Sequence, residues 1–102
     1  MQVPVEFKTT EKANYTLVEF ELARPLEPRD LPCILAKAPQ VTGAKGVVLS
    51  GRGPVWLFGA LVHEYHPTLW IATFDPRVEG AVVVSSHIAD VNVGDVIKVD
   101  SE

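Results

Sequence analysis

The feature that most constrains the fold is a strand, a glycine-rich turn and a helix in immediate succession. Residues 46–49 form a short apolar run of strand length that is rich in β-branched side chains. Residues 50–53 break this run, because their two glycines permit backbone angles that are closed to other residues. Pro54 then suits the first turn of a helix, where its missing N–H leaves no hydrogen bond unmade. We therefore predict a strand joined to a helix by a tight turn.

The predicted helix runs from Pro54 to Tyr65 and leads into a second strand. Its apolar side chains recur at helical spacing and form one wide stripe, made of Val55, Leu57, Phe58, Leu61 and Val62. Pro67 ends the helix, and the nearly continuous apolar run from Leu69 to Phe74 is typical of a strand covered on both faces. Residues 46–74 thus predict a β-α-β unit with parallel strands and a right-handed crossover.

The first third of the chain predicts a hairpin and a short helix. Val3 to Phe7 and Tyr15 to Leu22 favour two antiparallel strands, with a polar turn at residues 9–14 between them. A short helix is indicated between Pro25 and Lys37, where Pro32 interrupts the pattern.

Two further strands complete the predicted sheet. Residues 81–87 follow Phe74 so closely that the two strands must be antiparallel, and residues 96–99 form a last strand. The 102 residues of the chain are near the common size of one domain. We therefore predict the α/β class, with a single domain over residues 1–102 built as a small mixed sheet around a central parallel β-α-β unit.

Composition narrows the possible functions. The chain has 47% hydrophobic and 22% charged residues, as globular proteins do, and no apolar run reaches the roughly 18 residues of a membrane span. The first residues do not have the basic segment followed by an apolar segment that is typical of a signal peptide. The one cysteine, Cys33, favours a reducing compartment, so we expect a cytoplasmic protein with no membrane partner. The formal net charge of −4 argues against a general coat for long nucleic acid, but it leaves room for a small phosphate ligand.

The loops after the two parallel strands hold the residues best suited to bind phosphate. Both loops emerge at the same edge of the sheet, where open α/β folds bind their ligands. The turn made of Ser50, Gly51, Arg52 and Gly53 offers backbone N–H groups at a helix start. Arg52 and Arg77 add guanidinium groups, whose forked geometry matches phosphate oxygens. The alternative is that the glycines only allow a tight turn.

Histidines and one aspartate are the candidates for catalysis. His63 and His66 lie three residues apart at the end of the predicted helix and share a face there, although a structural role at the helix end is an equal alternative. Asp75 either begins a turn, orients a histidine or ligates a metal, and with His66 it could hold Mn²⁺. Because the crossover places His66 and Asp75 at opposite edges of the sheet, we expect a second copy of the chain to complete the site.

Four motifs occur in order along the second half of the chain: residues 46–57, His63 to His66, Asp75 to Arg77, and the segments 80–84 and 86–87. Their order and spacing closely resemble the ring nuclease three family, small accessory proteins of type III CRISPR systems. The resemblance implies a fold akin to the nucleotide-sensing (CARF-like) domains of CRISPR effectors and homodimers that pair around a ligand. It also implies cleavage of cyclic tetra-adenylate, the messenger that activates those effectors, to linear di-adenylate.

The resemblance implies functional roles for Ser50, Arg52, His66, Asp75, Arg77 and His87. We therefore predict His66, Asp75 and Arg77 as catalytic, His66 and Asp75 as ligands of Mn²⁺, and Ser50, Gly51, Arg52, Gly53 and His87 as ligand-binding residues. Two other activities stay open. One is a manganese-dependent exoribonuclease that acts on the 3′ adenylate ends of RNA, and the other is a non-catalytic module that binds the cyclic oligoadenylate.

Overall fold

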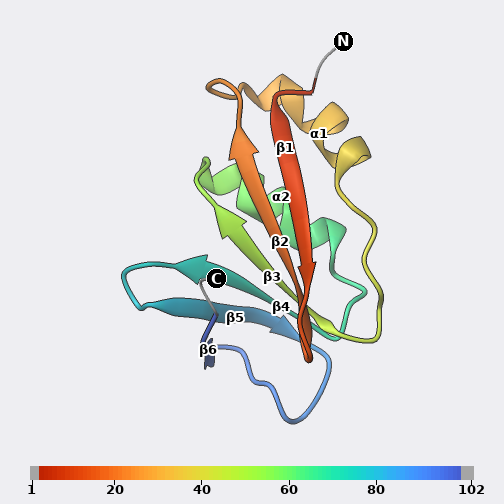
Figure 1. Cartoon of the computed structure of the whole chain (residues 1–102), viewed down its shortest axis with the longest axis vertical. Coiled ribbons are helices and arrows are strands. Elements are labelled where there is room, and N and C mark those ends of the chain that lie inside the picture. Colours follow the sequence, from red (N-terminus) through yellow and green to blue (C-terminus); the bar gives the residue numbers. More distant parts are fainter. Residues whose placement is uncertain (1–2, 100–102) are drawn as a thin grey trace.

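The computed structural model describes residues 3–99 as one mixed sheet with two helices (Figure 1). In spatial order, the strands are β1 (Val5–Glu11), β2 (Tyr15–Leu22), β3 (Gly46–Gly51), β4 (Trp70–Asp75), β5 (Gly80–Ser86) and β6 (Val96–Ile97). The helices are α1 (Leu31–Lys37), which follows the short 3₁₀ helix η1 (Pro28–Asp30), and α2 (Val55–Glu64). β2, β3 and β4 are parallel, and the other neighbouring pairs are antiparallel. The predicted α/β class, with a parallel β-α-β unit inside a mixed sheet, is confirmed.

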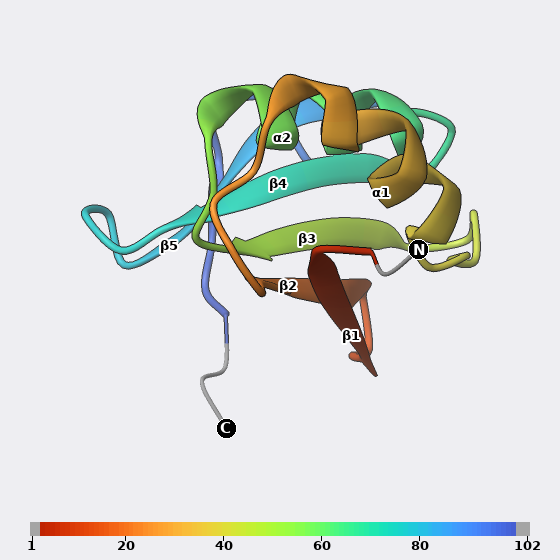
Figure 2. The ribbon, with the colours of Figure 1, turned by 90° about the horizontal axis from the view of Figure 1, so that it is seen from above.

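Both helices cover the same face of the sheet (Figure 2). Every second residue of β2, β3 and β4 points toward this face, as the alternation of side chains along a strand requires. The side chains buried completely between the helices and the sheet are Val18, Ile34, Val47, Leu49, Leu57, Leu61 and Ile71. This layer fixes α2, and with it the turn that follows β3.

The opposite face of the sheet is covered by the segment that follows β5. Ile88, Val91 and Ile97 pack there against a second cluster that includes Leu17 and Trp70. Leu17 breaks the alternating pattern of its strand because β2 is buried on both faces at this point. Near the end of β2 the same face carries charged side chains instead, so it is only partly covered.

The predicted bounds of the outer strands were wrong. The first strand runs over Val5–Glu11 rather than residues 3–7, and Thr9 and Thr10 pair with Val18 and Leu17 although they were expected in the turn. The apolar pattern stops at Phe7, but the backbone ladder continues because β-branched threonines are well accommodated in an edge strand. The last strand is shorter than predicted and comprises only Val96–Ile97.

The start of the second helix also differs from the prediction. Pro54 has an extended ψ of 155° and lies before the helix, which begins at Val55. Val55 is 85% exposed and is not part of the buried stripe. Leu57 and Leu61 pack against the sheet instead, and Phe58 lies edge-on to Phe20 with ring centroids 5.2 Å apart.

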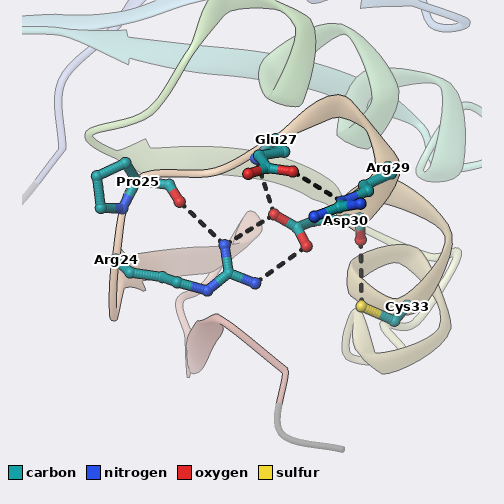
Figure 3. Close-up of polar contacts among 6 residues, drawn as sticks. All are labelled: Arg24, Pro25, Glu27, Arg29, Asp30 and Cys33. Carbon is teal, nitrogen blue, oxygen red and sulfur yellow. Dashed lines mark hydrogen bonds and ion pairs between the residues drawn. The ribbon is translucent and has the colours of Figure 1, made fainter.

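A polar cluster ties the chain after β2 to the start of α1 (Figure 3). The Arg24 guanidinium donates two hydrogen bonds of 3.0 Å to the Asp30 carboxylate, which also accepts the backbone N–H of Glu27 at 2.8 Å. These bonds, that from Arg24 above all, lower the pKa of Asp30 to about 2. Pro32 is tolerated because it stands in the first turn of α1, where its missing N–H has no helical partner.

Neither helix within residues 3–99 is long and apolar enough to cross a membrane.

Candidate functional site

The carboxyl edge of the sheet, where β2, β3 and β4 end, carries most of the predicted site residues. The parallel pairing of β3 and β4 brings the turn after Gly51 and the turn after Asp75 to this one edge, as expected from the sequence. The sheet is twisted, so the hairpin between β4 and β5 projects beyond the body of the molecule (Figures 1 and 2). The candidate phosphate-binding residues are therefore spread along the edge rather than gathered into one closed pocket.

The glycine turn has a structural reason of its own. β3 continues through Ser50 and Gly51, which pair with Glu19 and Phe20 of β2, so the strand is longer than predicted. A Cβ atom on Gly51 would lie 2.5 Å from the backbone oxygen of Phe20. Gly51 is thus required for the close approach of the two strands, whatever ligand the turn binds.

Arg52 is exposed and forms no salt bridge within residues 3–99. It borders a groove of about 690 Å³ over the open face of β1 and β2, which Lys8, Glu6, Glu19 and Glu21 also line. These carboxylates repel an anion inside the groove. With three carboxylates against Lys8 and Arg52, the lining of the groove is net negative, which disfavours a phosphate inside it.

Asp75 and Arg77 form a local ion pair at the tip of the hairpin. Oδ2 of Asp75 lies 2.9 Å from Nη2 of Arg77, and Oδ1 accepts the backbone N–H of Arg77 at 2.9 Å. The Arg77 side chain, through these bonds, holds the pKa of Asp75 below its ordinary value. Asp75 thus fixes the direction of a guanidinium whose side chain is otherwise 88% exposed. Arg77 keeps free N–H groups for a ligand.

The amino edge, where β2, β3 and β4 begin, carries a pair of histidines. The rings of His66, in the turn after α2, and His87, directly after β5, lie edge to face with centroids 5.1 Å apart. Nε2 of His87 is 3.2 Å from the backbone oxygen of His66, and the His87 backbone N–H donates to Leu69 at 2.8 Å. The expected face shared by His63 and His66 does not form on the helix, because α2 ends at Glu64.

The two edges are separated by the length of β4. The five steps of about 3.3 Å between its six residues put the ends of this strand about 17 Å apart, with His66 before its start and Asp75 at its end. One chain therefore cannot bring His66 and Asp75 to a single Mn²⁺, and residues 3–99 contain no cluster of three or more potential metal ligands. His87, predicted to bind ligand together with residues 50–53, also lies at the amino edge rather than beside them.

Comparison with known proteins assigns the chain to a family. The model of a CRISPR-associated protein family, Cas_csx3, matches residues 19–98. The chain belongs to the Cas_csx3 family. An uncharacterized protein of Aquifex aeolicus (strain VF5) is 56% identical over 87 residues, which cover 81% of this chain and 77% of the relative. The region matched by the Cas_csx3 family contains the residues of both edges, from Arg24 to His87.

Sequence reasoning missed one cationic residue at the carboxyl edge and the contact between the two histidines. Arg24 follows the end of β2 by two residues, as Arg77 follows the end of β4, and Arg52 stands directly after β3. The sequence places an arginine just beyond each of these three strands, and this pattern could have predicted their shared edge. It could do so only if β2 was known to be parallel to β3 and β4. The contact of His66 with His87 left no signal in the sequence.

Proposed function

We propose that this Cas_csx3 family member is a ring nuclease that cleaves cyclic tetra-adenylate to linear di-adenylate and thereby switches off type III CRISPR signalling. Membership of a CRISPR-associated family supports the biological setting. The observation that carries the proposal is the distribution of the polar residues: arginines suited to phosphate lie at one edge of the sheet and a histidine pair at the other. A ligand with several phosphates, held between the edges of two copies, would use both sets.

In this proposal each reactive site is shared between two copies of the chain. The amino edge of one copy, with His66 and His87, faces the carboxyl edge of the next, with Arg52 and Arg77. A cyclic oligonucleotide suits such a site because its phosphates and bases point outward in several directions at once. The predicted homodimer, and the pairing of dimers around the ligand, are part of the same proposal.

The chemistry follows from the residue types. Arg52 and Arg77 bind the phosphate oxygens and offset the negative charge that grows on them, with Asp75 holding Arg77 in position. His66 takes the proton of a ribose 2′-hydroxyl, and the oxygen attacks the adjacent phosphorus. The bond from phosphorus to the 5′ oxygen breaks, a 2′,3′-cyclic phosphate forms, and His87 returns a proton to the leaving 5′ oxygen. Two such cleavages convert the ring into two linear di-adenylates.

Manganese is a separate part of the proposal. His66 and Asp75 do not meet within one chain, so a Mn²⁺ ion bound by both would join two copies. The steps above use only side chains of the protein. Activity measured with added Mn²⁺ and with excess chelator decides whether an ion is required.

The experiment is a single-turnover incubation of the protein with cyclic tetra-adenylate, followed by chromatography of the products. We expect linear di-adenylate from the wild type and an intact ring from His66→Ala. A ring with 2′-deoxyribose at every position should stay intact as well, because it lacks the attacking hydroxyl. If the wild-type protein binds the ring tightly but leaves it intact, the protein is a module that sequesters the messenger. Faster cleavage of adenylate-tailed RNA than of the ring would indicate an exoribonuclease.

A further inference from the structure

A pocket of about 540 Å³ opens at the amino edge of the sheet, on the face opposite the helices. It lies between the starts of β2, β3 and β4 and the segment after β5, and its volume is in the range of small-molecule sites. We call it the amino-edge pocket. Its apolar walls are Tyr15, Trp70, Leu69, Ile88, Val91 and Ile97, and Asn14, Asp90 and Lys98 stand among its polar lining.

Two nearly buried aromatic side chains have polar atoms that form no hydrogen bond within the described part of the chain. Tyr15 is 8% exposed and Trp70 4% exposed, yet neither the Tyr15 hydroxyl nor the Trp70 indole N–H forms a hydrogen bond with any residue from 3 to 99. Every wholly buried side-chain nitrogen or oxygen in this part of the chain is satisfied. Both side chains line the amino-edge pocket, so a ligand bound there can reach the two polar atoms.

The aromatic pair is held rigidly. The rings of Tyr15 and Trp70 lie 6.1 Å apart, and the Trp70 indole covers Gly46 so closely that a Cβ atom there would lie 2.0 Å from the ring. A fixed aromatic wall with unused hydrogen-bonding atoms is typical of a ligand site rather than of a core, where polar atoms are paired.

We propose that the amino-edge pocket binds an adenine base. The apolar walls suit the faces of a planar base. The Trp70 N–H and the Tyr15 hydroxyl can donate to ring nitrogens, and the amide of Asn14 has the donor and acceptor pattern that matches N6 and N7 of adenine. Lys98, which also lines the pocket, carries the positive charge that a nucleotide phosphate requires.

The position of the pocket connects the base to the histidine pair. Ile88, the residue after His87, lines the pocket, and so does Leu69, whose backbone oxygen accepts the His87 N–H. A base in the pocket would therefore lie at the same edge of the sheet as His66 and His87. This inference rests on the proposed function: it assigns one adenine of the cyclic messenger to a defined subsite and explains why an adenylate is chosen.

The test is a titration with adenosine 5′-monophosphate followed by the indole N–H signals in NMR. We expect the Trp70 signal to shift to saturation, while that of Trp56, which packs with the helices on the other face, stays in place. Tyr15→Phe keeps the ring and should weaken binding roughly three- to tenfold, the effect of one hydrogen bond. Tyr65→Phe is the matched control, since its hydroxyl donates to Pro39 and neither residue lines the pocket, so the affinity should stay unchanged.

The outcomes separate this inference from the proposed function. No shift at Trp70, an equal shift with inorganic phosphate, or tighter binding of guanosine or cytidine monophosphate would overturn the adenine subsite, even if cyclic tetra-adenylate is cleaved. Binding of the adenosine nucleotide at Trp70, weakened by Tyr15→Phe, would establish the subsite even if the ring stays intact. In that case the ring-nuclease proposal fails and the base-binding pocket stands.

Discussion

The imidazole rings of His66 and His87 lie edge to face with centroids 5.1 Å apart, although the two residues are 21 positions apart in the chain. The pair stands at the amino edge of a sheet whose carboxyl edge carries Arg52 and Arg77. This opposition of the two groups is the basis of the proposed function, since a phosphodiester that needs both must be bound by two copies.

Removing either histidine of the pair should affect catalysis more than binding. We expect His66→Ala and His87→Ala to lower the single-turnover rate on cyclic tetra-adenylate by about 10²–10⁴-fold, the usual effect of losing a general acid or base. His63→Ala is the control, because His63 is exposed on the last turn of α2 and should retain wild-type activity. A variant of His66 that cleaves at the wild-type rate would remove this residue from the mechanism.

Asp75 should act through Arg77. Asp75→Asn keeps the shape of the turn but removes the charge that fixes the guanidinium, so we expect weaker ligand binding and a smaller loss of activity than in Arg77→Ala. The double variant should lose no more than Arg77→Ala alone. An additive loss, measured in a double-mutant cycle, would show that Asp75 has an independent role.

The stability of the cluster around Arg24 should depend on pH. The pKa of Asp30 is about 2 in the folded protein against an ordinary 3.8, so the native state binds fewer protons than the unfolded state. The stabilisation is therefore fully present above about pH 4 and is lost as the pH falls through about 2. Thermal unfolding should show that the Tm of the wild type exceeds that of Asp30→Asn by an amount that decreases as the pH falls from about 4 to about 2. A difference in Tm that stays constant down to pH 2 would contradict the lowered pKa of Asp30.

Two glycines should respond in opposite directions to the same substitution. Gly46→Ala places a methyl group within 2.0–2.5 Å of the Trp70 ring, and we expect the free energy of unfolding to fall by about 1–3 kcal/mol through overpacking. Gly59 lies on the exposed side of α2 with nothing near its missing Cβ, so Gly59→Ala should raise stability by about 0.5–1 kcal/mol. Denaturant unfolding measures both, and equal effects would argue against the packing of Trp70 on β3.

The sequence predicted the central unit because local chemistry determines it. The glycines near Arg52, the periodicity of α2 and the apolar run of β4 each report on a few neighbouring residues, and together they placed Ser50 and Asp75 at one edge. The burial of Leu17 and the contact of His66 with His87 depend instead on how the segment after β5 folds across the sheet. Such contacts between distant segments leave no periodic pattern, so only the structure revealed them.

The central claim, a site shared between copies, is tested most directly by mixing two inactive variants. His66→Ala keeps an intact carboxyl edge, and Arg77→Ala keeps an intact amino edge. In an equal mixture, one in four of all random contacts between an amino edge and a carboxyl edge joins two intact edges. Combined in equal amounts, the two variants should recover about a quarter of the wild-type activity on cyclic tetra-adenylate. A mixture that stays as inactive as its components would contradict the shared site and place the reaction within one chain.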